Sequence, residues 1–188
     1  MPSVDYKRKK LEYSYELFKA HKFFKKARAV VVHENKVLLI EVTYLEGNTK
    51  DLVKNDNRKA GNKHYLLPGG GVDDDETIKQ AVTREALEEY GVKVKPIQYL
   101  GKSYYNVPMN IDGTDFKSNR VEYYYLCKLE SANELEQFGL DGEFEEKGKL
   151  YKKVRLSLSD VEKLDASDIN DMRQEVYDKL ISYLKNAK

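Results

Sequence analysis

The sequence predicts an α/β domain in which strands precede, surround and follow one glutamate-rich helix. Two apolar, β-branched runs come first, a helical segment with a glycine-rich start lies in the centre, and further strand-like runs follow it. A chain of 188 residues is long enough for one well-packed domain with an additional element or two. We therefore expect residues 1–26 to form an N-terminal helical extension and residues 27–188 to form the main domain.

The first expected element is a helix over residues 5–26. Apolar side chains recur there at roughly helical spacing among Lys and Glu, at Leu11, Tyr15, Phe18 and Phe23, and no proline intervenes. Such a helix packs on this domain or on a partner subunit, so a homodimer is one interpretation. A basic amphipathic helix can also lie on a membrane, but that requires a cleaner apolar face than this one.

Two strands and a long polar connection are expected next. Ala27–Val32 and Lys36–Val42 are β-branched and apolar, and the three polar residues between them indicate a hairpin. The stretch Tyr44–Lys63 is polar, contains several Gly and Asn residues and has no strong period. Long connections in compact domains are often functional, so we expect this stretch to be a lid over the site.

A glycine loop and a helix are expected between Leu67 and Val92. Asp75 or a neighbouring Asp can cap the helix, because acidic side chains are favoured by the helix dipole at this end. The helix is expected to continue through Glu89. Gly91 is a suitable residue to end it, since glycine adopts the left-handed backbone conformation at low cost.

Glutamates interrupt the apolar face of this expected helix. At 100° per residue, Glu85 and Glu89 lie inside the apolar arc and Glu88 lies at its edge. The arc itself is set by Ile78, Ala81 and Val82. Burying unpaired carboxylates is costly and adjacent ones repel, so a divalent cation is the simplest compensation. The alternative is an acidic helix that is simply solvated.

Two further strands follow the helix, over Val92–Tyr105 and Arg120–Leu129, joined by a turn around residues 110–113. Residues 131–149 form a second polar and acidic connection.

The end of the chain is expected to hold one strand and two helices. Lys152–Leu158 reads as the strand, and Ser159 or Asp160 can cap a short helix after it. The closing helix is marked by Ile169, Met172, Val176, Leu180, Ile181 and Leu184.

Seven residues at fixed spacing carry a resemblance to a known family: Gly70, Glu76, Arg84, Glu85, Glu88, Glu89 and Gly91. Seven such matches arise by chance at about one in 10^8 start positions. The spacing resembles the Nudix box, although the bulky apolar residue expected after the Arg-Glu pair is Ala86 here. The resemblance implies a Nudix-type α/β/α sandwich with a mixed sheet. It also implies a metal-dependent enzyme that cleaves a pyrophosphate bond in a nucleoside diphosphate linked to another group.

The resemblance also implies roles for the residues of the box. Glu85, Glu88 and Glu89, with the carbonyl of Gly69, would bind Mg²⁺ or Mn²⁺. Glu76 and Arg84 would form an ion pair that holds the loop against the helix. Gly70 and Gly91 would have structural roles at the two ends of the box.

The general base is open between two positions. In some Nudix enzymes a box glutamate takes the proton of the attacking water, and in others a glutamate on a distant loop does so. The distant candidates are Glu143, Glu145 and Glu146, although three glutamates in a polar segment are more often simply exposed.

The second part of the substrate must be bound by other residues. Arg28, at the start of the first strand, is a phosphate-binding candidate by analogy. Tyr105 and Tyr123 are candidates for stacking on a nucleobase, because the chain has 15 tyrosines and no tryptophan. Most strand tyrosines instead pack in the core or at an edge. A nucleotide sugar, ADP-ribose and a modified nucleotide all remain open as substrates.

Composition limits the partners. The formal net charge is +1, so no global field attracts nucleic acid or an anionic membrane, and we expect neither as a partner. The single cysteine fits a reducing compartment, and neither a long apolar stretch nor a secretory signal is present, so we expect a cytoplasmic protein. The expected partner is a small-molecule nucleotide. A non-catalytic nucleotide sensor with the same fold is the alternative, but sensors often lose the box glutamates that this chain retains.

Overall fold

The structure, a computed structural model, describes residues 4–45, 61, 63–138, 143–146, 149–170 and 172–186, without the side chains of residues 4–6 and 137. The strands are β1 (Phe24–His33), β2 (Lys36–Tyr44), β3 (Lys63–Leu66), β4 (Val94–Ile111), β5 (Thr114–Leu129), β6 (Glu143–Glu146) and β7 (Lys149–Ser157). The helices are α1 (Val4–Lys19), α2 (Ile78–Glu85), the π-helical turn η2 (Ala86–Tyr90), α3 (Glu134–Phe138), α4 (Leu158–Val161), the 3-10 turn η3 (Ala166–Asp168) and α5 (Gln174–Asn186).

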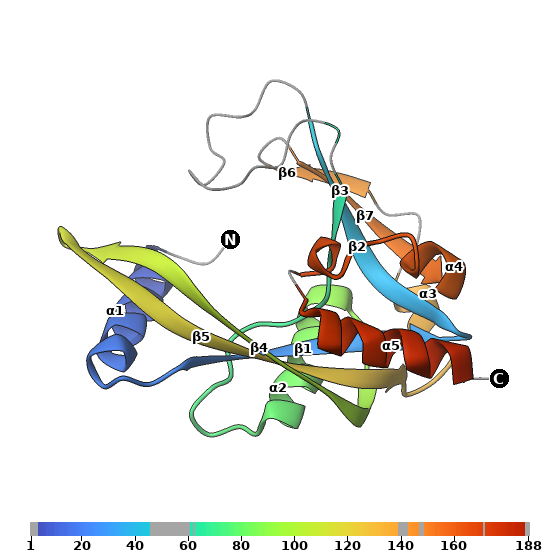
Figure 1. The fold of residues 1–188 in the computed structure, drawn as a ribbon, viewed down its shortest axis with the longest axis horizontal. Helices are drawn as coiled ribbons and strands as arrows, with labels where there is room; N and C mark the ends of the chain where they lie inside the picture. Colours follow the sequence, from blue (N-terminus) through green and yellow to red (C-terminus); the bar gives the residue numbers. More distant parts are fainter. Residues whose placement is uncertain are drawn as a thin grey trace.

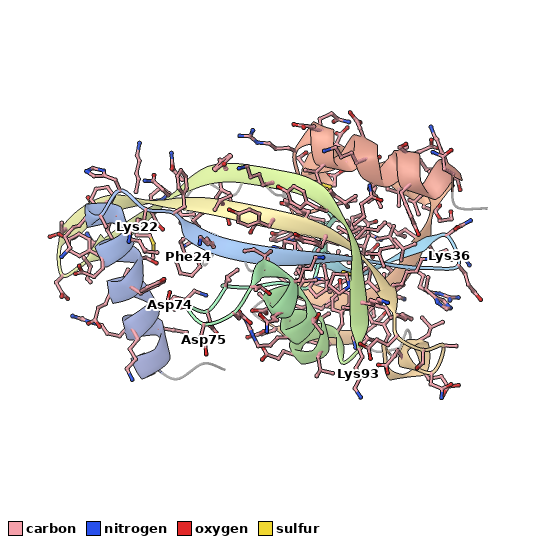
Figure 2. All side chains as sticks on the ribbon, turned by 90° about the horizontal axis from the view of Figure 1, so that it is seen from below. Lys22, Phe24, Lys36, Asp74, Asp75 and Lys93 are labelled. Atoms are coloured by element: carbon pink, nitrogen blue, oxygen red, sulfur yellow. The ribbon has the colours of Figure 1, made fainter. Side chains whose placement is uncertain are left out.

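The described strands form one mixed sheet that lies between helices. Its order is β4-β5-β1-β2-β7-β6, and β3 pairs with β2 outside this path (Figure 1). β1 and β5 are parallel, whereas the other neighbours in this order are antiparallel. Figure 2 shows α5 on one side of the sheet and α1 and α2 on the other. The predicted α/β sandwich with an additional N-terminal helix is therefore confirmed.

The sheet splits between β1 and β2. The two strands pair only beside their shared turn, where Val32 faces Val37 and His33 faces Lys36. The turn between them has left-handed φ angles of 49° and 57° at residues 34 and 35, as a tight two-residue hairpin requires. Beyond the hairpin, β2 pairs with β3 and β7 instead. The predicted hairpin is confirmed, and it opens a gap in the sheet.

The glycine loop occupies this gap. The amide of Ala27 donates to the carbonyl of Gly70 at 2.9 Å, and the amide of Ala29 donates to the carbonyl of Pro68 at 2.9 Å. The segment Pro68–Val72 thus satisfies the backbone groups of β1 that β2 leaves unpaired. Because these bonds fix the loop to the centre of the sheet, the residues that follow it have a rigid starting point.

Alternation along β1 divides the core between the two faces. Val30 and Val32 belong to the cluster beneath α5, whereas Ala29 and Val31 belong to the cluster beneath α2. All four are buried, and each apolar side chain of valine size contributes roughly 1.5–3 kcal/mol when removed from water. This alternation also fixes the face of the sheet towards which each polar side chain of β1 points.

The N-terminal helix packs on this same domain. Phe116, near the tip of the long β4–β5 hairpin, lies 5.2 Å from Tyr15 and 5.5 Å from Phe18 between ring centroids. The helix ends at Lys19, however, and the expectation of a helix to residue 26 was wrong. His21 is left-handed with φ 55°, and the chain then enters β1 at Phe24, where strand pairing with β5 overrides helical spacing.

Other boundaries also differ from expectation. β4 and β5 are longer than predicted and extend to a tight turn at Asp112 and Gly113, within the predicted turn. Ser157, rather than Ser159 or Asp160, caps the short helix α4. The closing helix begins at Gln174, so Ile169 and Met172 precede it. Each shift reflects pairing or capping partners that apolar spacing does not reveal.

The two polar connections contain short elements. Tyr44 ends β2 and Lys63 begins β3, and Leu45 and Gly61 of the predicted lid are also described, whereas its residues 46–60 and 62 lie outside the described residues. The acidic connection over 131–149 holds α3 and β6, and its last residue begins β7. Among the helices described, none combines the length and apolar character that a membrane span needs.

Two glycines on the long hairpin provide a test of the packing of α5. Gly101 and Gly113 both have positive φ, but a Cβ on Gly101 would lie 2.8 Å from Cγ2 of Val176, whereas nothing lies within 4 Å of one on Gly113. We expect Gly101→Ala to lower the free energy of unfolding by about 2–3 kcal/mol and Gly113→Ala by about 1 kcal/mol. Urea unfolding of both variants measures this. Equal losses would contradict the close contact with α5.

Candidate active site

The helix of the glutamates begins at a capping box. The amide of Gln80 donates to Oγ1 of Thr77, and the amide of Thr77 donates to Oε1 of Gln80 at 2.8 Å. Thr77 is therefore the cap, and the expectation of Asp75 or a neighbouring Asp was wrong. The acidic run forms a separate turn instead, in which the Asp73 amide donates to Oε1 of Glu76. Gly91 ends the helix with φ 74°, as predicted.

Arg84 joins the glycine loop to this helix. Its Nη2 donates to Oε1 of Glu76 at 2.6 Å and to the carbonyl of Gly71 at 2.9 Å. Its Nη1 lies 2.9 Å from Oε1 of Glu85 and 3.2 Å from Oε2 of Glu88. The hydrogen bonds from Arg84 lower the pKa of Glu76, which keeps that carboxylate charged. The ion pair that the resemblance implied is present in the structure.

Glu85 is the buried glutamate of the box. Glu85 is 7% exposed, and its carboxylate occupies the space next to Gly70. A Cβ on Gly70 would lie only 2.2 Å from Oε1 of Glu85, so any larger residue here would displace this carboxylate. Burial raises the pKa of Glu85, and the neighbouring Glu88 and Glu89 charges act in the same direction, although Arg84 opposes them.

The other two glutamates are exposed because the helix widens. The wheel at 100° per residue placed Glu89 in the apolar arc, which was wrong, since the π-helical turn η2 begins directly after Glu85. A wider turn rotates each residue by less, so Glu88 and Glu89 point away from the core. The carboxylate of Glu89 is instead held by the amide of Gly69, which donates to its Oε2 at 2.8 Å.

The donors of this region suit a hard cation. Glu85, Glu88, Glu89 and the carbonyl of Gly69 are all oxygen ligands, as Mg²⁺ or Mn²⁺ prefers. Glu85 is buried beside the two other carboxylates, and Arg84 is the neighbouring cation. The three glutamates together therefore carry negative charge that Arg84 alone does not balance. Within the described ranges, however, no three acidic, His or Cys side chains converge closely enough to hold an ion. The set therefore fits a cation in chemistry, but its side chains are not converged.

A second polar centre surrounds Glu122 on β5. This residue is 4% exposed, and its Oε1 lies 2.9 Å from Nη2 of Arg28, 2.8 Å from the Tyr105 hydroxyl and 3.1 Å from Nζ of Lys26. The hydroxyl of Tyr124 donates to Oε2. Burial alone would raise the pKa of Glu122, but the two cations and the donated hydrogen bonds outweigh it and lower the pKa to about 2.

This centre forms the floor of a hollow of about 490 Å³ near the start of α5. The hollow is lined by Lys26, Arg28, Ser103, Tyr104, Tyr105, Glu122, Asn170 and Arg173. Three cations and one carboxylate give it a net positive charge, which suits an anionic ligand. Burial is the main cause that lowers the pKa of Lys26 to about 8, with the charge of Arg28 acting in the same direction and Glu122 opposing it.

Arg28 connects the hollow with the glutamate helix. Its Nη1 donates to the carbonyl of Gly69 at 2.7 Å, and its other face is bound to Glu122. Burial would lower the pKa of Arg28, but the charges of Glu122 and, more weakly, of Glu89 raise it. The two polar centres therefore lie side by side, with the glycine loop between them.

The structure separates the other predicted residues. Tyr105 lies in the hollow with Arg28, whereas Tyr123 is on the opposite face of the sheet and lines a different hollow. Glu143, Glu145 and Glu146 lie on the outermost strand β6, where Glu143 pairs with Lys152 at 2.7 Å. In Figure 1, β6 lies in the upper part of the view and α2 in the lower part.

Several residues of the hollow were missed from the sequence. Glu122 carries a signal, since it is a charged residue at a core-facing position of an apolar strand, between Val121 and a run of tyrosines. Asn170 and Arg173 carry no such signal, because they lie in an irregular segment before α5. Asn170 has a left-handed φ of 51° and accepts a hydrogen bond from the Leu67 amide, which ties this segment to the glycine loop.

The domain combines a split mixed sheet, a glycine loop in its gap and a glutamate helix behind the loop. Its sequence matches a known domain family. The model of the NUDIX domain matches residues 23–172, and the chain belongs to this family.

Two similar curated proteins are both described as RNA pyrophosphohydrolase. The one from Tolumonas auensis is 33% identical over 94 residues, 46% of this chain and 54% of the relative. The one from Shewanella pealeana is 32% identical over 82 residues, 40% and 47%. The chain thus spans about half the length of these relatives.

Solved structures of Nudix hydrolases are also similar to this chain. A NUDIX hydrolase from Nitrosomonas europaea has 18% identity and a TM-score of 0.47, and the match covers 89% of this chain and 91% of that one. An ADP-ribose pyrophosphatase from Streptococcus suis has 21% identity and a TM-score of 0.44, with 88% and 92% covered.

Replacing Arg84 tests whether it holds the loop to the helix. We expect Arg84→Ala to lower the free energy of unfolding by about 1–3 kcal/mol, less than for a fully buried pair because the side chain is 30% exposed. Lys93→Ala, which removes an exposed cation just after the same helix, should change stability by less than about 0.5 kcal/mol. Thermal or urea unfolding measures both. An Arg84→Ala variant as stable as wild type would exclude the architectural role.

The acidic limb of the pH–stability curve tests the centre at Glu122. The pKa of this carboxylate is lower in the folded chain, so its contribution is complete above pH 4.5 and is lost as the pH falls towards 2. At about 1.4 kcal/mol per pH unit, the loss is about 3 kcal/mol. Glu122→Gln should flatten this limb by that amount, whereas the exposed Glu130→Gln should not. Parallel curves for wild type and Glu122→Gln would show that folding does not lower the pKa of this carboxylate.

Proposed function

We propose that the protein is a divalent-metal-dependent hydrolase. In this proposal it cleaves a pyrophosphate bond in a nucleoside diphosphate linked to another group, by attack of water at phosphorus. The observation that carries the proposal is the contact between the glutamate helix and the cationic hollow. The loop at Gly69 binds Glu89 through its amide and Arg28 through its carbonyl. The names of the curated relatives agree with cleavage of a pyrophosphate bond.

Glu85, Glu88, Glu89 and the carbonyl of Gly69 would hold Mg²⁺ or Mn²⁺. A bound divalent ion supplies neutralisation of the pyrophosphate charge and lowers the pKa of water. Glu85 is buried and bound by Arg84, so it serves to anchor the site. Glu88 and Glu89 are exposed and can take the proton that the attacking water loses.

Residues of the hollow would bind the phosphates and orient the substrate. Lys26 and Arg28 present cationic groups, and Glu122 fixes both of them so that little side-chain entropy is lost on binding. Tyr105 is fixed by the same carboxylate. This arrangement holds the anhydride beside Glu89 and leaves the rest of the hollow for the group linked to it. A nucleotide sugar, ADP-ribose and a modified nucleotide all have suitable chemistry.

The setting that we propose is cytoplasmic. The single cysteine, Cys127, is buried, and burial raises its thiol pKa to about 12, so it takes no part in the chemistry. A Nudix-fold sensor would bind the same ligands without cleaving them. It differs from the proposed enzyme in one measurable property, which is turnover in the presence of Mg²⁺.

Replacing Glu89 tests the proposed chemistry. Glu89→Gln keeps the side-chain shape but removes one charge, so we expect kcat with Mg²⁺ to fall by at least about 10²-fold. Addition of EDTA should abolish turnover of the wild type. Phosphate release from a panel of nucleoside diphosphate derivatives measures both, with Glu130→Gln as the matched control on an exposed glutamate outside the box. Normal turnover in Glu89→Gln at saturating Mg²⁺ would contradict the assignment, and binding without turnover in wild type would indicate the sensor.

A further inference from the structure

Arg28 is almost fully engaged by contacts within the chain. Its Nη1 donates to the carbonyl of Gly69 at 2.7 Å and to that of Leu67 at 3.4 Å. Its Nε and Nη2 donate to Oε1 of Glu122 at 3.3 Å and 2.9 Å. A guanidinium has five N–H groups, and these bonds use four of them. Because Arg28 is also only 9% exposed, this arrangement leaves little of it for a phosphate oxygen.

The proposed metal ligands are engaged in the same way. Arg84 donates through Nη1 to Oε1 of Glu85 at 2.9 Å and to Oε2 of Glu88 at 3.2 Å. Glu89 accepts from the amide of Gly69, and the carbonyl of Gly69 accepts from the guanidinium described above. Each proposed ligand therefore has a partner within the chain, and the described acidic side chains do not converge on one point. Donors of the protein itself occupy the oxygens that a cation would use.

The bond between Arg28 and Gly69 conflicts with a divalent ion on the same carbonyl. Mg²⁺ binds its oxygen ligands at about 2.1 Å. Nη1 of Arg28 already lies 2.7 Å from this oxygen, so the two cations would repel each other at close range. The contact with Glu122 has no such conflict, because it uses Nε and Nη2. Metal binding therefore favours a state in which Nη1 leaves Gly69 while the other two nitrogens stay on Glu122.

We propose that Arg28 couples the binding of the divalent cation to the binding of the substrate phosphates. Without the cation, Nη1 is bonded to the carbonyl of Gly69. When the cation takes this carbonyl, Nη1 regains its two N–H groups and donates them to a phosphate oxygen in the hollow. The proposal rests on the proposed function and adds cooperativity to it, since each of the two ligands raises the affinity for the other.

The two cations on Glu122 provide matched variants. Arg28 and Lys26 lie 2.9 Å and 3.1 Å from the same Oε1, and in the described contacts only Arg28 also donates to Gly69. Arg28→Met and Lys26→Met therefore remove the same charge from the same partner, but only the first frees the carbonyl. Arg28→Lys keeps the charge, and its single ammonium nitrogen should stay with the carboxylate of Glu122 and release Gly69.

Titration with Mn²⁺ in the absence of phosphate tests the competition for Gly69. Electron paramagnetic resonance of the free ion gives the Kd without any need for turnover. We expect Arg28→Met and Arg28→Lys each to bind Mn²⁺ at least about tenfold more tightly than wild type, because the binding-competent state then becomes the major one. Lys26→Met should change the Kd by less than about threefold, since it acts on the ion only through space. Circular dichroism checks the fold of each variant, and Arg28→Lys alone suffices if Arg28→Met does not fold.

Calorimetric titration with inorganic phosphate, with and without Mg²⁺, tests the reciprocal effect. In wild type, Mg²⁺ should lower the Kd for phosphate by at least about tenfold, because coupling between two ligands is reciprocal. Direct contact between the ion and the phosphate supplies part of this factor, and that part remains in every variant. We expect the factor to fall to about threefold or less in Arg28→Met and to stay near the wild-type value in Lys26→Met.

The outcomes distinguish this proposal from the proposed function. Equal Mn²⁺ affinities in wild type and Arg28→Lys, or equal gains in Arg28→Met and Lys26→Met, would overturn the coupling even if nucleoside diphosphate derivatives are hydrolysed. An unchanged effect of Mg²⁺ on phosphate binding in Arg28→Met would overturn it as well. Coupling that depends on Arg28, in a protein that releases no phosphate from any of these derivatives, would support the proposal and overturn the hydrolase.

Discussion

The site depends on the backbone pairing of the glycine loop with β1. Because β2 leaves β1 after the hairpin, the amides of Ala27 and Ala29 need other acceptors, and the loop supplies them. The approach is so close that a Cβ on Gly69 would lie 2.0 Å from the carbonyl oxygen of Ala27. The loop is thereby fixed at the centre of the sheet. Its remaining groups then face Arg28 on one side and Glu89 on the other.

Charges on the two faces of the loop balance in different ways. On the helix side, Arg84 is one cation among several carboxylates, so negative charge is in excess. On the hollow side, Glu122 is one carboxylate among Lys26, Arg28 and Arg173, so positive charge is in excess. A polyphosphate bound to a divalent ion needs both environments, one for the ion and one for the phosphate oxygens. Only the glycine loop separates the two environments.

The sequence predicted the elements whose signals are local. The box residues, the hairpin after β1 and the glycine end of the helix were all visible as short patterns. Residues that depend on distant partners were not visible. β3 has only four residues and pairs with the edge of β2 that β7 does not occupy, and α1 ends early because Phe24 pairs with β5. Glu122 becomes part of the site only when β1 and β5 lie side by side.

The same distinction explains the error on Glu89. A wheel with constant rotation assumes that a helix remains α-helical throughout, and the spacing of the box contains no sign of a wider turn. The amide of Gly91 reaches back five residues to the carbonyl of Ala86, a longer span than an α-helical bond makes. The spacing of the box therefore does not reveal that Glu89 points away from the core.

The π-helical turn has a consequence for which sequence changes the domain tolerates. Deleting one residue from Ala86–Tyr90 would replace the wider turn by an ordinary α-helical one, and Glu89 and Tyr90 would then lie at different angles about the helix axis. Tyr90 would then lose the carbonyl of Leu66, and Glu89 would lose the amide of Gly69. Exchange of an exposed residue such as Leu87 disturbs neither bond. In related chains, this turn should therefore vary in composition and stay constant in length.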